Sequence, residues 1–128
     1  MGAKVQGKAT IGHLRKIGSK RLFGKLTLKL LAQAGACGDT TVLYERLGPA
    51  ARLPNVYHSK TSEWLYCLSG SMSAIVDGRR HRLSAGSMLF LPPGVRHRFV
   101  TAKRACEALS IFSPALDLGR GGDVHVEP

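Results

Sequence analysis

Apolar and polar residues alternate along much of the chain, and this period of two predicts short β-strands rather than helices. Within residues 22–32, Leu26, Leu28 and Leu30 alternate with polar neighbours, which is the pattern of a strand with one buried face. A second strand is expected over residues 40–47, where residues that favour β-structure precede a Gly-Pro break.

The central part of the chain carries the clearest turn signals. Residues 63–70 form a strand-like segment with largely apolar residues on both faces, as in one wall of a sandwich or barrel. Asp77 and Gly78 separate two runs that can pair, and both central residues of a type I′ turn need a positive φ. We therefore expect a β-hairpin at this point. Pro93 and Gly94 fit the central positions of a type II turn further along.

Strand signals continue to the C-terminal part of the chain, over residues 87–92, 96–101 and 105–113. About eight short strands, with turn signals roughly every eight to twelve residues, predict an all-β sandwich or barrel in one domain. The expected organisation is a flexible basic arm at 1–20 with one short strand as a candidate for dimer formation, a barrel at 21–114 and a poorly fixed tail at 115–128.

The charge of the chain is uneven. The formal net charge is +11, and eight Lys or Arg residues precede the first acidic residue, Asp39. Such a field attracts anionic partners, but a solvated basic surface is the simpler interpretation. Nucleic acid ranks last among the partners because no nucleic-acid motif accompanies the charge.

Cysteine usage and apolar run lengths bear on location. Cys37, Cys67 and Cys106 are widely spaced, odd in number and not preceded by a secretory leader, which favours free thiols in a reducing cytoplasm. No apolar run approaches the roughly 20 residues that cross a bilayer. A soluble, cytoplasmic protein without membrane contact is expected.

Potential metal ligands bracket the predicted central strands. The spacing His58-x4-Glu63-x6-Gly70, followed by Gly86-x5-Pro92-x-Gly94-x2-His97, resembles the two motifs of the cupin family. The resemblance implies a jelly-roll barrel, also called a double-stranded β-helix, with a metal held inside its mouth. It also implies a homodimer, because members of the family pair through their sheets.

Three positions depart from the family pattern. The opening glycine of the first motif is Gly48, two residues earlier than the pattern places it. Carried over residue by residue, the resemblance gives His58, Glu63 and His97 as ligands, but Val56 stands where the first motif has another histidine. Thr101 replaces the final asparagine of the second motif. Two imidazoles and one carboxylate suffice to hold Fe(II), Mn, Ni or Zn and leave positions for water or substrate.

The alternation of inward and outward side chains along the predicted strands adds further candidates to the site. Counting from Glu63 and from His97, it places Leu65, Cys67, Phe99 and Thr101 on inward faces as candidate pocket residues. His81 is a weaker candidate, and the alternative is an exposed strand residue. Three further residues, Lys60, His13 and His125, are better read as surface or tail positions.

Two functions of different classes remain open from the sequence. The first is a metal-dependent enzyme acting on a small molecule, for which an anion is one option, by oxygenation, isomerisation or lyase chemistry. Glu63 would then be a ligand or a general base. The second is a metal-free module that binds or senses a small ligand in its barrel, which the substitution at Val56 favours.

Overall fold

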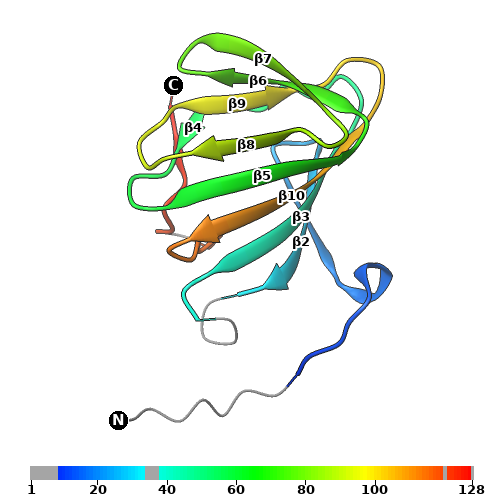
Figure 1. Cartoon of the computed structure of the whole chain (residues 1–128), viewed down its shortest axis with the longest axis vertical. Coiled ribbons are helices and arrows are strands. Elements are labelled where there is room, and N and C mark those ends of the chain that lie inside the picture. The colour runs from blue at the N-terminus through cyan, green and yellow to red at the C-terminus, as the bar shows by residue number, and fades with distance from the viewer. Residues whose placement is uncertain (1–8, 34–37, 120, 128) are drawn as a thin grey trace.

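The computed structural model describes residues 9–33, 38–119 and 121–127 of the chain. Within them, two antiparallel sheets face each other as a jelly-roll barrel (Figure 1). The predicted all-β class is therefore confirmed. No helix in the described part is long and apolar enough to cross a membrane.

The described residues contain eleven strands, against the eight or so expected. The six-stranded sheet has the order β1-β2-β3-β10-β5-β8 and the five-stranded sheet the order β11-β4-β9-β6-β7. The bounds are Ser19–Leu22 (β1), Leu26–Ala32 (β2), Thr41–Leu47 (β3), Val56–Tyr57 (β4), Ser62–Ser69 (β5), Ser71–Val76 (β6), Arg79–Ser84 (β7), Met88–Leu91 (β8), His97–Val100 (β9), Cys106–Ser113 (β10) and His125–Val126 (β11).

Turn chemistry decides several boundaries. Asp77 and Gly78 have φ values of 47° and 82°, so the predicted β6–β7 hairpin with two central positive-φ residues is confirmed. The strand predicted over 22–32 is instead interrupted, because Phe23 and Gly24 turn the chain at φ values of 52° and 82°. Leu22 consequently ends β1, and β1 pairs with β2 of the same chain.

The core lies between the two sheets. Alternation along β5 buries Glu63, Leu65 and Cys67 and leaves the residues between them exposed. At the far end of β5, the free thiols of Cys67 and Cys106 are buried with their Sγ atoms 3.4 Å apart. Cys37 lies outside the described residues.

The C-terminal segment is part of the barrel, which corrects the expectation of a poorly fixed tail. His125 and Val126 pair with Tyr57 and Val56 of β4, and Leu116 is buried in the core. Too little strand pattern marks this segment in the sequence, because only two of its residues pair with β4.

Candidate metal centre

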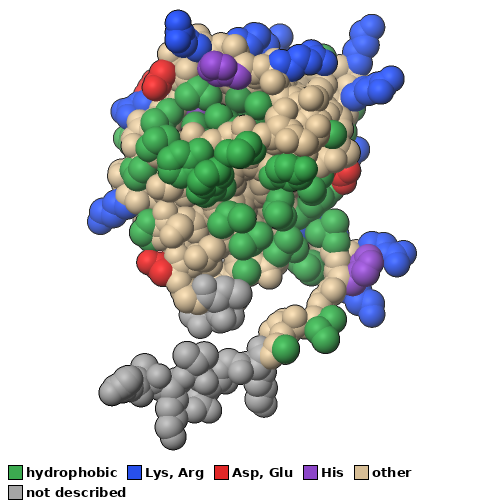
Figure 2. Space-filling model, viewed as in Figure 1, with side chains coloured by type: hydrophobic (Ala, Val, Ile, Leu, Met, Phe, Trp, Pro, Cys, Tyr) green, Lys and Arg blue, Asp and Glu red, His purple; other side chains and the backbone are tan. Residues whose placement is uncertain are grey.

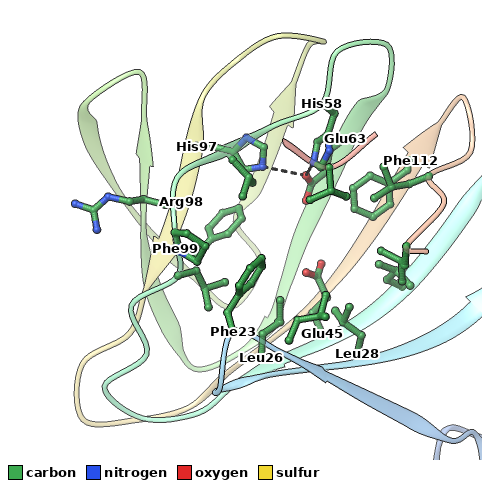
Figure 3. A pocket seen from close by; sticks show the side chains of 18 residues that line it. Phe23, Leu26, Leu28, Glu45, His58, Glu63, His97, Arg98, Phe99 and Phe112 are labelled. Carbon is green, nitrogen blue, oxygen red and sulfur yellow. Dashed lines mark ion pairs between the residues drawn. The ribbon is translucent and has the colours of Figure 1, made fainter. Parts of the chain in front are cut away.

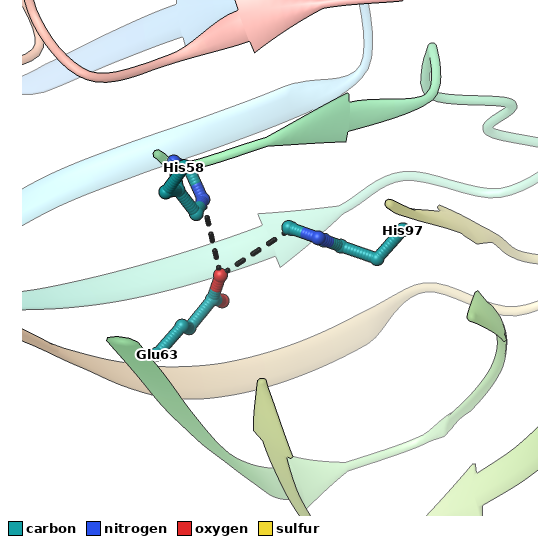
Figure 4. A group of neighbouring side chains, drawn as sticks. All are labelled: His58, Glu63 and His97. Atoms are coloured by element: carbon teal, nitrogen blue, oxygen red, sulfur yellow. Dashed lines mark ion pairs between the residues drawn. The ribbon is translucent and has the colours of Figure 1, made fainter. Parts of the chain in front are cut away.

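Three buried side chains from three separate segments meet inside the barrel (Figure 4). His58 follows β4, Glu63 lies near the start of β5 and His97 begins β9. The Nε2 atoms of His58 and His97 lie 3.4 and 3.5 Å from the same carboxylate oxygen, Oε1 of Glu63. One ligand atom from each residue falls within 4.8 Å of the others, so the predicted triad is assembled.

Backbone carbonyls orient both imidazoles. Nδ1 of His58 lies 2.7 Å from the carbonyl oxygen of Asp123, and Nδ1 of His97 lies 3.0 Å from that of Val95. A carbonyl only accepts, so each Nδ1 carries the proton and donates it. Each Nε2 is thereby turned toward Glu63, which is how metal-binding histidines are commonly held.

Hydrogen bonds connect the loop that carries His58 to the turn before His97 and to the C-terminal segment. The amide of Gly94, at a φ of 86°, donates to the carbonyl oxygen of His58 at 2.7 Å, so the turn before His97 also fixes the loop that carries His58. The carboxylate of Asp123 accepts hydrogen bonds from the amides of Ser59, Lys60 and Thr61. The C-terminal segment therefore fixes the other side of the same loop.

The electrostatics of the triad favour a charged carboxylate. Burial alone would raise the pKa of Glu63, but the hydrogen bonds and charge of His58 and His97 lower it. Burial alone would lower the pKa of His58, whereas the hydrogen bonds to Glu63 and Asp123 raise it. A carboxylate with two imidazole nitrogens turned toward it is stabilised by protons on those nitrogens or by a cation between them.

The donor set fits a divalent transition metal. Two Nε2 atoms and one carboxylate oxygen converge, and nitrogen and oxygen donors of this kind bind such ions at about 2.0–2.2 Å. Val56, which stands in place of a fourth ligand, lines the adjoining cavity and pairs with His97 across the sheet. The residues present would hold the ion from one side and leave its other positions open toward the cavity.

The adjoining cavity is lined by residues from both sheets and from the C-terminal segment (Figure 3). Of the candidate pocket residues, Phe99 lines it. Leu65 and Cys67 are buried in the core but do not line it, because they lie further along β5. Thr101 belongs to a different part of the barrel, where its hydroxyl donates to the carbonyl of Gly48 and accepts from the amide of Ala51.

The remaining histidines of the described chain lie outside the triad. His81 is exposed on β7, which is the alternative that the sequence left open. His125 stacks on Tyr57 and contacts the Asp123 carboxylate at 2.9 Å. His13 is exposed and accepts a hydrogen bond from the amide of Arg15.

Sequence reasoning missed two polar residues of the site. Asp123 lies in the segment expected to be loose, and no local pattern marks it. Glu45 lies on β3 and is buried beside the cavity. Its position in step with Leu43 and Leu47 on the inward face of a predicted strand was a signal that could have identified it.

The chain belongs to the cupin family, because the sequence profile of the cupin domain matches residues 43–112, more than half of the chain. The structure of KdgF from a Halomonas species resembles it with a TM-score of 0.77 at 17% identity, over 86% of this chain and 97% of that one. At this identity the likeness shows the fold.

Two curated relatives are partly similar in sequence. Protein SchB of Streptomyces halstedii is 32% identical over 75 residues, which are 56% of this chain and 54% of that protein. Quercetin 2,3-dioxygenase of Bacillus subtilis is 24% identical over 100 residues, 77% of this chain and 30% of that enzyme. The chain thus spans about half or less of the length of these relatives.

Proposed function

We propose that this protein is a small metal-dependent cupin enzyme that holds a divalent transition metal through His58, Glu63 and His97. The observation that carries the proposal is the convergence of two imidazole Nε2 atoms on one buried carboxylate oxygen. The similarity of the chain to part of a quercetin dioxygenase supports an enzyme of oxygenase type, with isomerase and lyase chemistry as the alternatives.

His58, Glu63 and His97 would have separate roles in the proposed enzyme. The metal, when bound, supplies Lewis acidity and open positions for water or substrate. His58 and His97 keep their Nδ1 protons on backbone carbonyls, so their Nε2 lone pairs remain available as donors. Glu63 supplies negative charge as a ligand, or accepts a proton as a general base, and the side chains of all three residues are buried.

Metal analysis tests this function. The protein is purified without chelator, supplied in turn with Fe(II), Mn, Ni and Zn, and assayed for bound metal by mass spectrometry. We expect about one ion per chain, lost in His97→Ala and Glu63→Gln. His81→Ala is the matched control, because His81 is exposed on β7, and it should retain the ion.

The alternative is a metal-free module that binds a small ligand. The apolar Val56 at the cavity favours it, because it removes one ligand of the family pattern. If the protein takes up none of the four metals while it remains folded by circular dichroism, the enzyme proposal is rejected and the metal-free binding module is supported.

We further propose a homodimer formed through the outer face of the six-stranded sheet. Large apolar side chains that are about two-fifths to half exposed gather there over β5, β8 and β10 (Figure 2): Trp64, Tyr66, Leu68, Met88, Phe90 and Ile111. Together they expose on the order of 500 Å², a substantial part of the roughly 800 Å² that each partner contributes to a standard interface.

Light scattering after size-exclusion chromatography tests the dimer. The native protein should elute with twice the mass of the chain, and Tyr66→Asp combined with Met88→Asp should elute as a folded monomer. Ser84→Asp, at an exposed position of β7 in the other sheet, should leave the dimer intact. A monomeric native protein would reject the proposal.

A further inference from the structure

The cavity beside the metal centre is apolar on nearly all sides. Thirteen of its eighteen lining residues are Leu, Phe, Val or Pro, and Phe23, Phe99 and Phe112 surround it (Figure 3). Its volume is about 70 Å³, smaller than the roughly 150 Å³ of an engineered cavity that binds benzene. At that size the cavity encloses only part of a ring-sized ligand, so the rest of the ring would lie toward the open side, where Phe23 is 44% exposed.

The cavity offers an anion no cationic side chain apart from the two histidines of the triad. Arg98 is the one Lys or Arg among the lining residues, and its guanidinium points away from the others (Figure 3). The two acidic side chains, Glu45 and Glu63, are both buried. Beyond the triad, where the proposed cation would lie, an anionic group would lose its hydration among apolar walls, which is unfavourable.

Glu45 and Glu63 share one hydroxyl group. Ser110 on β10 lies between β3 and β5, and its Oγ is hydrogen-bonded both to Oε1 of Glu45 and, at 3.1 Å, to Oε2 of Glu63. A hydroxyl has a single proton to donate, so it can donate to only one of the two carboxyl groups. The other carboxyl group must carry a proton and donate to Ser110.

The proton belongs to Glu45. Glu63 already faces two imidazole Nε2 atoms, which favour its charged form. Burial, together with the nearby charge of Glu63, raises the pKa of Glu45, in agreement with the hydrogen-bond count. Glu45 therefore donates through Oε1 to Ser110, and its second oxygen, Oε2, is a carbonyl acceptor with no partner among the described residues.

We propose that the cavity binds an uncharged molecule whose apolar ring lies among the phenylalanine side chains and whose hydroxyl group donates a hydrogen bond to Oε2 of Glu45. The inference rests on the proposed function, because it names the class of substrate that would reach the metal centre. The proposed substrate is thus a neutral alcohol or phenol, whereas the sequence had left an anionic substrate as one option.

Three small probes test the ligand class on the full chain after metal removal by chelator. Phenol has the ring and the hydroxyl, anisole has the ring without a donor, and benzoate has the ring with a negative charge. Dissociation constants come from ligand-observed NMR titrations. We expect phenol to bind about 3- to 10-fold more tightly than anisole, the factor that one net hydrogen bond supplies, and benzoate to bind at least about 10-fold more weakly than phenol.

Two variants test the role of Glu45. Glu45→Gln keeps both a donor for Ser110 and an oxygen acceptor, so its affinity for phenol should stay within about 2-fold of native. Glu45→Leu removes the acceptor and should bind phenol no better than anisole, while retained anisole binding shows that its cavity is intact.

Three results would overturn the inference. They are benzoate binding as tightly as phenol, no phenol binding to folded protein, and a phenol preference that persists in Glu45→Leu. Because these titrations use metal-free protein, they are independent of the metal analysis. A chain that binds no metal would reject the proposed enzyme and leave the ligand class standing.

Discussion

The contacts by which the C-terminal segment holds the loop at residues 58–61 can be tested by removing one carboxylate, that of Asp123. Asp123 accepts four hydrogen bonds from residues 59–61: the Ser59 amide and hydroxyl and the Lys60 amide, each at 2.7 Å, and the Thr61 amide at 3.1 Å. Burial alone would raise the pKa of Asp123, but the hydrogen bonds from Ser59, Lys60 and His125 lower it, so the carboxylate stays charged. Asp123→Ala removes all four of these contacts at once, together with the contact to His125.

The size of the effect follows from these contacts. A hydrogen bond to a charged group contributes roughly 1.5–3 kcal/mol, but the four bonds share one carboxylate that is partly solvated, so they do not add. We expect the free energy of unfolding to fall by about 2–4 kcal/mol. Because the carbonyl of Asp123 also orients His58, metal affinity should fall by roughly 10- to 100-fold as well.

Urea unfolding followed through Trp64, the single tryptophan, measures the stability, and a metal titration measures the affinity. Asp117→Ala is the matched control, because Asp117 is exposed and its carboxylate accepts, among the described residues, only from the amide of Gly119 at 2.8 Å. If the free energy of unfolding of Asp123→Ala is within about 0.5 kcal/mol of this control, the range expected of ordinary surface changes, the Asp123 carboxylate does not hold the loop.

Three further predictions concern the scaffold. Gly70→Ala should lower the free energy of unfolding by roughly 3 kcal/mol or more, because the added Cβ would meet a backbone oxygen at 2.1 Å at a φ of +73°. Gly78→Ala, with open space around it, should lower it by about 1 kcal/mol, and equal melting temperatures of the two variants would contradict this. Thr101→Val should lose about 1–3 kcal/mol by leaving one buried amide and one carbonyl unpaired, whereas Thr101→Ser should remain near native in urea unfolding. Side-chain hydrogen bonds lower the pKa of Glu107, so the stability that its charge contributes is present above the unfolded-state pKa and is lost as the pH falls through the lowered folded value. Glu107→Gln should therefore lose less stability below about pH 4.5 than native protein does. Parallel pH profiles of the two proteins would show that Glu107 has no such role.

The sequence was sufficient to predict the fold class and the convergence of His58, Glu63 and His97, because both depend on local signals. Alternation and turn residues specify strands and hairpins such as the one at Asp77 and Gly78, and the motif spacing carries His58, Glu63 and His97. The sequence was weaker at strand ends, where the left-handed conformation of Phe23 interrupts an otherwise continuous apolar pattern. No propensity marks a phenylalanine for that conformation.

Tertiary structure decided what surrounds the triad. Glu45 and Glu63 lie on strands separated by β10, and only the sheet order places Ser110 between them. Asp123 lies more than sixty residues from the loop that it fixes, so its role depends on contacts that no local pattern encodes. The sequence by itself determined which residues could bind a metal, whereas the packing of distant segments determined how they are oriented and that the adjoining cavity is apolar.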